Sequence, residues 1–207
     1  MVESMRRRFA ASQWLPYPLP VVFAFLANPQ HLPLLMPLAW KPRIESAHIA
    51  APRHRPVTSH KISNVAAGEG STIAISFRPF PFSLVRQRWE ASITEFHWND
   101  HFCDRQAHGP FAFWEHCHRV REENSGTRIT DEVSYEMKLG VVGNLAHRLF
   151  LSAQIEKLFA YRQSRIEELL AAWHTASNVP LRPAPRVRQP LRKKAGKLKW
   201  KLMNLTK

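Results

Sequence analysis

The sequence predicts an α+β domain in which one curved antiparallel sheet is covered by a long helix towards its C-terminal end. Between residues 43 and 137, apolar residues recur at every second position in short segments separated by turn residues, which is typical of an antiparallel sheet. After Gly143 the apolar spacing changes to three and four, which indicates an amphipathic helix. The 207 residues and 44% hydrophobic content suffice for one well-buried core and a tail.

The N-terminal part of the domain is expected to hold one strand and a compact corner. Arg7–Trp14 alternates between the two sides of an extended chain, which predicts a first strand. Prolines interrupt the chain repeatedly between residues 16 and 42. Because proline fits the first turn of a helix but not its interior, we expect two short helices, at Val21–Ala27 and Leu32–Met36.

The sheet should continue as a meander of about seven further strands. Turn-forming residues separate the strands, as at Trp98–Asp100 and Glu123–Gly126. The expected strands are Arg43–Ile49, Val57–Asn64, Ser71–Arg78, Leu84–Phe96, His101–Gln106, Phe111–Arg121 and Thr127–Met137.

One long helix is predicted at Leu145–Trp173, roughly 45 Å long at 1.5 Å per residue. The residues of its apolar stripe are Leu145, Leu149, Ser152, Ile155, Phe159, Arg162, Ile166, Leu170 and Trp173. Such a stripe must lie on a broad apolar surface, and the concave side of the sheet is the surface that the chain offers. We therefore expect the helix to pack across the sheet.

The period of two also predicts which side chains face this helix. Trp89, Ala91 and Ile93 define the inward side of their strand. The matching positions on the next strands are Phe102, Asp104, Gln106, Trp114, His116, His118, Val120, Ile129, Asp131, Val133 and Tyr135. The wall is mostly apolar, but it contains two carboxylates, which are costly to bury unpaired.

Asp104 and Asp131 should therefore be paired, and His116, His118 and Arg162 are the expected partners. Two interpretations follow from the residues alone. These polar groups form either one end of a pocket, where they orient a ligand's oxygen atoms, or a satisfied network within the core.

Several short motifs occur together with this order of elements. They are Pro20-x-Val-Phe-x-Phe-Leu26, Trp89, Phe102-x-Asp-x-Gln106, Gly109-Pro-Phe111, Trp114-x-His-x-His118, Asp131-x-Val-x-Tyr135 and Phe159-x-Tyr-Arg162. In these motifs the chain resembles the polyketide cyclase/dehydrase-like branch of the START/birch-pollen-allergen superfamily, abbreviated SRPBCC, over about residues 6 to 172. The resemblance implies a helix-grip fold and a cavity for a lipid, polyketide or other hydrophobic molecule, whereas a fold of this kind does not by itself dictate chemistry.

The predicted function is the binding of a small hydrophobic ligand between the sheet and the long helix. The expected ligand-binding residues are Trp89, Phe102, Asp104, Gln106, Phe111, Trp114, His116, His118, Asp131, Tyr135, Phe159 and Arg162. The alternative is a cyclase or dehydratase, which needs a base to remove a proton next to a carbonyl and an acid to expel water. Its candidate catalytic residues are His116, His118, Asp131 and Tyr135.

The same strand also contains a candidate metal site. His116 and His118 have the His-x-His spacing, which on a strand directs both imidazoles to one side, and Asp104 offers a third ligand. No fourth ligand is indicated by the sequence, and the resemblance implies no metal. We therefore expect neither a metal nor another cofactor.

The sequence divides into a domain at residues 6–174 and a tail at residues 175–207. Ten of the positive charges follow Glu168, where no carboxylate occurs, so subtracting them from the net charge of +14 leaves +4 for the rest. The tail holds a proline-rich linker and then a basic amphipathic segment, which predicts contact with an anionic membrane. The expected contact residues are Lys194, Lys197, Leu198, Trp200, Lys201 and Leu202. The alternatives are a disordered solubilising tail and a peripheral protein whose tail contacts phosphates, although nucleic acid is a partner that we do not expect.

The sequence also predicts the location of the protein. No apolar run approaches 18 residues, and Met1–Phe9 lacks the apolar stretch of a secretory signal, so a cytoplasmic protein is expected, peripheral to the inner membrane if the tail binds it. Cys103 and Cys117 should lie on neighbouring strands and remain thiols in that compartment.

Overall fold

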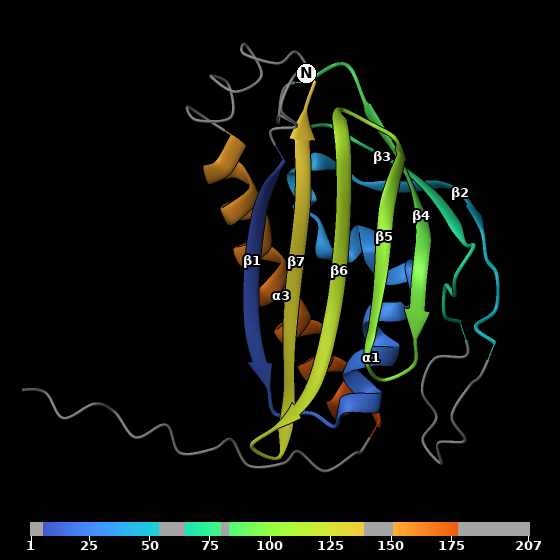
Figure 1. The fold of residues 1–207 in the computed structure, drawn as a ribbon. Coiled ribbons are helices and arrows are strands. Elements are labelled where there is room, and N and C mark those ends of the chain that lie inside the picture. Colours follow the sequence, from blue (N-terminus) through green and yellow to red (C-terminus); the bar gives the residue numbers. More distant parts are fainter. Residues whose placement is uncertain (1–5, 54–64, 80–82, 139–150, 178–207) are drawn as a thin grey trace, which may run out of the picture.

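The computed structural model describes residues 6–53, 65–79, 83–138 and 151–177. Within these residues one seven-stranded sheet forms, with the order β1-β7-β6-β5-β4-β3-β2, and every neighbouring pair is antiparallel (Figure 1). The strands are β1 (Arg7–Leu15), β2 (Arg43–His48), β3 (Thr72–Phe77), β4 (Gln87–His97), β5 (His101–His108), β6 (Phe111–Glu123) and β7 (Gly126–Met137). The predicted curved antiparallel sheet is confirmed, and its first strand returns to pair with its last.

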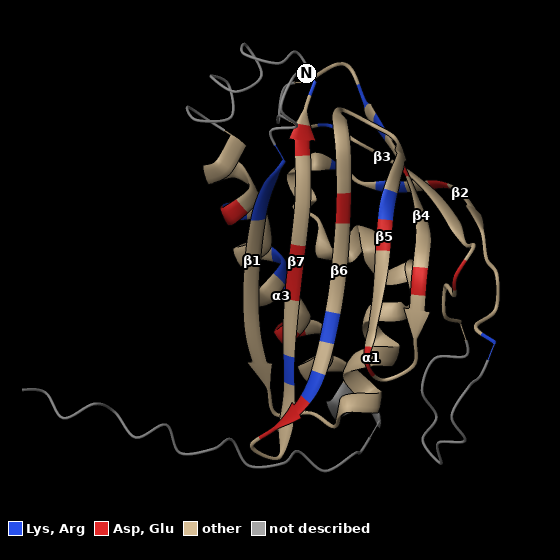
Figure 2. Cartoon of the chain, viewed as in Figure 1, with Lys and Arg blue, Asp and Glu red and all other residues tan. Residues whose placement is uncertain are grey.

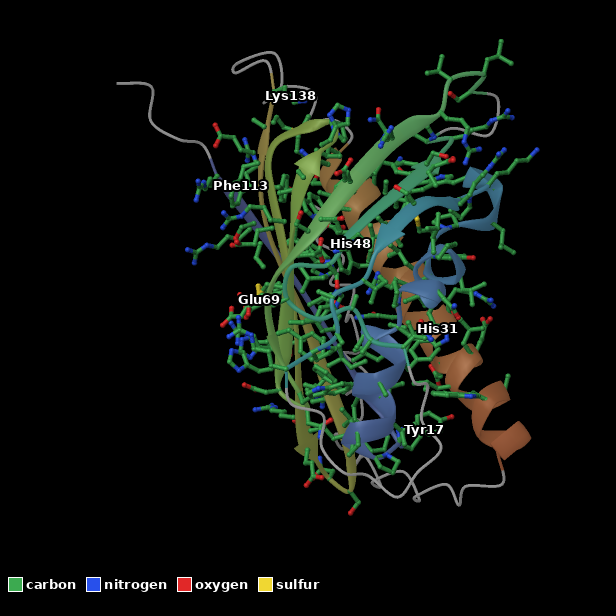
Figure 3. All side chains as sticks on the ribbon, turned by 90° about the vertical axis from the view of Figure 1, so that its right-hand side faces the viewer. Tyr17, His31, His48, Glu69, Phe113 and Lys138 are labelled. Atoms are coloured by element: carbon green, nitrogen blue, oxygen red, sulfur yellow. A yellow bond between two sulfur atoms is a disulfide. The ribbon has the colours of Figure 1, made fainter. Side chains whose placement is uncertain are left out.

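The helices lie on one face of the sheet. They are α1 (Leu19–Ala27), the 3-10 helices η1 (Pro29–Leu35) and η2 (Leu38–Trp40), and α3 (Ser152–Ser177). Figure 3 shows α1 and α3 on one side of the sheet and Phe113 on the other. The two layers therefore enclose a core on one face and leave the opposite face to solvent, as expected for an α+β domain.

The corner after β1 differs in detail from the prediction. α1 begins two residues earlier than expected, at Leu19, with Pro20 in its first turn. The second short helix occupies Pro29–Leu35 rather than Leu32–Met36, because the side chain of Asn28 accepts a hydrogen bond from the Gln30 amide at 3.0 Å and starts the new turn there. The short turn η2 follows Pro37 and has no counterpart among the predicted helices.

Strand β4 also begins later than predicted. The hydroxyl of Ser83 donates to the carbonyl of Val85 at 2.7 Å, and this local bend precedes the strand. Leu84 is 91% exposed, so it belongs to a loop and not to the wall of the sheet. The expected strand Val57–Asn64 and the first six residues of the expected helix, 145–150, lie outside the described residues.

A tight hairpin fixes the alignment of β6 with β7. Asn124 and Ser125 both have positive φ, 49° and 61°, as a two-residue turn of this kind requires. Gly126 follows because the carbonyl of Leu15 and the Trp14 ring approach it so closely that a Cβ would collide with them. The hairpin therefore sets which β6 residue lies opposite each β7 residue as far as Glu136, beyond which a bulge between Phe111 and Phe113 shifts the register.

The core lies between the concave face of the sheet and α3. Ile155, Phe159, Ile166 and Leu170 are the helix residues most deeply buried, each at most 4% exposed, which confirms the predicted apolar stripe. Gln13 donates from Nε2 to the carbonyl of Gln163 at 2.9 Å and so links the edge strand to the helix. The long helix therefore packs across the sheet as predicted.

The outer face of the sheet is charged. Figure 2 shows acidic and basic positions interspersed along β4 to β7. The Phe113 ring lies there beneath two guanidinium groups, with Arg6 4.0 Å and Arg105 5.4 Å from its centroid. This face carries ion pairs with exposed partners, which contribute little to stability individually.

The prediction of two free thiols is wrong. Cys103 and Cys117 lie directly opposite each other on β5 and β6, their Cα atoms are 4.0 Å apart, and their sulfur atoms are joined in a disulfide. The prediction rested on the expected compartment, whereas the register places both side chains on the same face at bonding distance.

Candidate functional site

A polar cluster sits in the middle of the concave face. His116 and His118 come from β6, Asp104 from β5 and Asp131 from β7. The registers place Asp104 opposite His116 and Asp131 opposite His118, so three neighbouring strands bring the four side chains together. This polar cluster comprises four of the residues that the sequence analysis selected.

Asp131 is the centre of the polar cluster. Its Oδ1 lies 3.0 Å from Nε2 of His116, a hydrogen bond between buried side chains. The same oxygen lies 2.6 Å from Nδ1 of His118, but off the line of a hydrogen bond. On the other side of His116, Nδ1 is 3.8 Å from Oδ2 of Asp104. The expected pairing of the carboxylates with histidines is therefore present for Asp131 and looser for Asp104.

Helix α3 covers the polar cluster with Arg162 and Phe159. Nη2 of Arg162 is 3.5 Å from Nε2 of His118, and the ring of Phe159 meets that of His116 edge-on at 5.3 Å. On the sheet side the Phe102 ring lies 4.4 Å from that of His118. Apolar groups thus surround the polar cluster on two sides.

Burial sets the charges of the polar cluster. Burial would raise the pKa of Asp131, but His118 and His116 outweigh it and hold the pKa well below its usual range, so this carboxylate is ionised. Burial and the neighbouring His116 lower the pKa of His118 to about 3, so this imidazole is neutral at pH 7. Burial raises the pKa of Asp104, which His116 and Arg162 offset only in part.

The predicted aromatic residues form one packed group beside the polar cluster. Trp89 and Trp114 meet edge-on at 5.1 Å, Phe111 lies 4.8 Å from Trp114, and Tyr135 lies 5.9 Å from both of these rings. These rings contact one another, so they contribute to the core. Burial raises the pKa of the Tyr135 hydroxyl, which keeps it protonated.

Gln106 has a structural role. Its Nε2 donates to the carbonyl of Phe111 at 2.9 Å, and its Oε1 accepts from the amide of Phe111 at 3.3 Å. Both ends of the amide group are therefore bound by the hairpin between β5 and β6. Alternation along the strand predicted that Gln106 faces the ligand, whereas its amide group hydrogen-bonds to the backbone of Phe111.

A pocket of about 340 Å³ opens between β1, β7 and the first turns of α3. Its lining residues are Arg7, Arg8, Phe9, Tyr135, Ser152 and Glu156. Tyr135 is the predicted ligand-binding residue among them. The sequence analysis missed the role of Arg7, although Arg7 shares the parity of Phe9 on its strand and so points to the same face.

Phe159 lies between this pocket and the polar cluster. Its ring is 4.9 Å from that of Phe9, which lines the pocket, and 5.3 Å from that of His116. Phe159 is 3% exposed. The Phe159 ring thus contacts both the pocket wall and the buried polar cluster.

Other parts of the sequence predictions are not tested by these residues. The tail with Lys194, Lys197, Leu198, Trp200, Lys201 and Leu202 lies outside the described residues. Among the helices that are described, none is long and apolar enough to cross a membrane.

Solved structures with the same architecture are numerous, although their sequences are distant. The protein Ms6760 from Mycobacterium smegmatis is 15% identical, with a TM-score of 0.54 over 81% of this chain and 92% of its own. The protein NE0264 from Nitrosomonas europaea is 13% identical, with a TM-score of 0.57 over 81% and 96%. A norcoclaurine synthase from Thalictrum, solved as a point mutant with a transition-state analogue, is 13% identical, with a TM-score of 0.56 over 84% and 99%.

These similarities concern the fold. No family model matches the chain, and no curated protein matches its sequence. Plant proteins of the same architecture include the major latex-like protein 151 of Panax ginseng, at 11% identity and a TM-score of 0.51 over 79% of this chain and 97% of its own. The chain has the helix-grip fold predicted from its sequence, which these solved structures share.

Proposed function

We propose that the protein binds a small hydrophobic molecule, such as a lipid or polyketide, in the pocket between β1, β7 and α3. The pocket itself carries this proposal, because about 340 Å³ lies within the range of small-molecule sites. Phe9 supplies an aromatic wall that continues into Phe159 and the core. The apolar part of a ligand would lie against this wall.

The other side of the pocket suits a polar end group. Arg7, Tyr135 and Ser152 provide a guanidinium and two hydroxyl groups, all of which donate hydrogen bonds. Two arginines and one glutamate line the pocket, so its charge favours an anionic group on the ligand. An apolar body with one acidic group is therefore the proposed ligand chemistry.

Two fluorescent probes test this chemistry. 1-Anilinonaphthalene-8-sulfonate has an apolar body and an anionic group, and N-phenyl-1-naphthylamine is its uncharged counterpart. We expect the anionic probe to bind with one equivalent and Arg7→Gln to weaken it about tenfold, because a charge-assisted hydrogen bond is lost. The affinity of the uncharged probe should change less than twofold. Equal effects on both probes would refute the anionic part of the proposal.

A pair of helix variants tests the place of binding. Ser152 lines the pocket, whereas the adjacent Ala153 is exposed. Ser152→Trp should fill the pocket and abolish binding of both probes, and Ala153→Trp should leave binding unchanged. If Ser152→Trp binds both probes like the parent protein, the ligand does not bind in this pocket.

A cyclase or dehydratase is the second candidate, and the hydrogen bond between His116 and Asp131 favours it. An imidazole held by a carboxylate is a frequent general base, and the protonated Tyr135 hydroxyl at the pocket wall would be the acid. Incubation with polyketide or lipid substrates, followed by mass spectrometry, distinguishes the two candidates. If the substrates are bound but recovered unchanged, the enzymatic candidate is ruled out and ligand binding is the remaining function.

The tail extends the proposal to a membrane surface, where a lipid-binding domain would be close to its ligand. The basis is the sequence alone, since leucines recur there at spacings of three and four, as in an amphipathic helix, with lysines on the other side and Trp200 nearby. The full chain should sediment together with anionic liposomes. Replacing Lys194, Lys197 and Lys201 by glutamine should release it, and unchanged sedimentation would remove the membrane from the proposal.

A further inference from the structure

Two imidazoles and one carboxylate of the polar cluster have the donor set of a transition-metal site. One ligand atom each from Asp104, His116 and His118 lies within 4.8 Å of the other two. Ligand atoms that share a tetrahedral zinc ion at 2.0–2.2 Å lie about 3.3 Å apart, so movements of about an ångström would bring this set to bonding distance. The cross-strand pair Asp104–His116 and the His-x-His spacing both arise from the rigid sheet.

Asp131 holds both imidazoles from the side opposite to Asp104. Its Oδ1 faces Nε2 of His116 at 3.0 Å and Nδ1 of His118 at 2.6 Å. The ring nitrogens left for a metal are therefore Nδ1 of His116 and Nε2 of His118. A metal-binding histidine usually donates its other ring N–H to a carboxylate, which is the role that Asp131 has for His116, while it faces Nδ1 of His118 at close range without an aligned hydrogen bond.

This arrangement removes the objection that the sequence raised. A metal site with three protein ligands keeps its fourth position for water or substrate, so no fourth protein ligand is needed. Asp104 provides the access, because its side chain keeps 18% exposure while the histidine side chains keep 8% and 4%. The polar cluster thus has three donors, an orienting carboxylate and one side towards solvent.

We propose that Asp104, His116 and His118 bind a divalent first-row transition metal ion, with Asp131 orienting the two imidazoles. Two imidazoles and one carboxylate suit zinc and iron(II), and the remaining position would be open to water. This proposal is independent of ligand binding in the pocket, because the pocket is lined by other residues.

Replacing Arg162 should raise metal affinity, whereas replacing a metal ligand should lower it. Its guanidinium lies 3.5 Å from Nε2 of His118, where it occupies the approach to that nitrogen and repels a cation. Replacing Arg162 by methionine keeps an apolar stem and removes the charge. Metal affinity should then rise about tenfold, a gain that general damage to the fold does not produce.

A second group on the opposite face of the sheet supplies the matched control. Glu95, His97 and His101 also bring three ligand atoms within 4.8 Å, but Glu95 and His97 are exposed and ion pairs already join them. His97→Gln removes a histidine from this surface group and leaves the polar cluster intact. It should not change metal binding at the proposed site.

The experiment uses the full chain after treatment with EDTA, with Zn²⁺ measured by calorimetry and Co²⁺ by its visible absorption. We expect one equivalent of metal in the parent protein and in His97→Gln. Asp104→Asn should weaken binding at least a hundredfold, and Asp131→Asn tenfold to a hundredfold as an orienting residue. Circular dichroism establishes whether each variant is folded.

Nuclear magnetic resonance of the histidine ring nitrogens keeps the test decisive if an aspartate variant does not fold. Zn²⁺ should shift Nδ1 of His116 and Nε2 of His118 in the parent protein. The proposal is overturned if no metal binds, if His97→Gln abolishes the binding, or if the shifted nitrogens belong to other histidines. Naphthalene probe binding, measured in EDTA, reports the pocket separately, so failure of one proposal is distinguishable from failure of the other.

Discussion

The ring of Phe159 lies 4.9 Å from that of Phe9, and this contact ties the closing helix to the edge strand of the sheet. Phe159→Ala removes a side chain that is 3% exposed and also contacts His116. We expect the free energy of unfolding to fall by about 3–5 kcal/mol, because a buried phenylalanine leaves a cavity that the surroundings fill only partly. Urea denaturation measures the loss, and Lys157→Ala on the exposed side of α3 is the control. A loss below about 1 kcal/mol would show that the helix does not pack here.

Asp131 should be the most sensitive polar position in the core. It is 2% exposed and faces both His116 and His118, whereas its neighbour Glu132 is exposed on the other side of β7. Asp131→Asn should cost about 3 kcal/mol in metal-free protein, because removing one partner leaves buried polar groups uncompensated. Glu132→Gln should change the free energy of unfolding by less than about 0.5 kcal/mol. Equal effects of the two substitutions would contradict the inward orientation of Asp131.

His101 should make stability depend on pH. Burial lowers the pKa of His101, but hydrogen bonds to Glu95 and Asp100 outweigh it, so the pKa lies above its usual value. The resulting stabilisation is fully present below the unfolded pKa of about 6.5 and is lost as the pH rises through the higher folded pKa.

The test compares His101→Asn with His108→Asn. His108 lies at the exposed end of the same strand and is the control. His101→Asn should lower the free energy of unfolding at both pH values. The loss should be larger at pH 5.5 than at pH 8.5 by about 0.5–1 kcal/mol, the size expected of partly exposed ion pairs. The second variant should show no such difference. If the stability difference between the parent protein and His101→Asn instead grows as the pH rises, the pKa of His101 is not raised.

The disulfide closes a short loop, since Cys103 and Cys117 are 14 residues apart in the sequence. Reduction should lower the free energy of unfolding by up to about 3 kcal/mol, mainly because the unfolded chain gains freedom. The β5–β6 ladder is held by its own hydrogen bonds, so circular dichroism of the folded protein should not change. The Cys103→Ser/Cys117→Ser double variant should be insensitive to the reductant. Two titratable thiols in protein purified without reductant would contradict the bond.

The sequence was sufficient to predict the layers and the faces of the elements. Alternation placed Asp104, His116 and Asp131 on the concave side, and helical spacing placed Phe159 against it, because these periods follow from backbone geometry alone. The proline-rich corner was predicted less well. There the Asn28 side chain decides where the 3-10 helix begins, and apolar spacing does not report such a cap.

The register between strands was the information that the sequence lacked. The hairpin at Asn124 and Ser125 places Asp131 opposite His118, and the β5–β6 pairing places Cys103 opposite Cys117. The pocket was missed for a related reason. Arg7 comes from the first strand and Ser152 from the closing helix, and their meeting depends on β1 pairing with β7.

Backbone chemical shifts measured during a titration with 1-anilinonaphthalene-8-sulfonate test the proposed function most directly. If the ligand occupies the space between β1, β7 and α3, the largest changes in the ¹H–¹⁵N spectrum should fall on Arg7, Phe9, Tyr135 and Ser152. Shifts confined to the charged outer face around Phe113, or spread evenly over the chain, would contradict it.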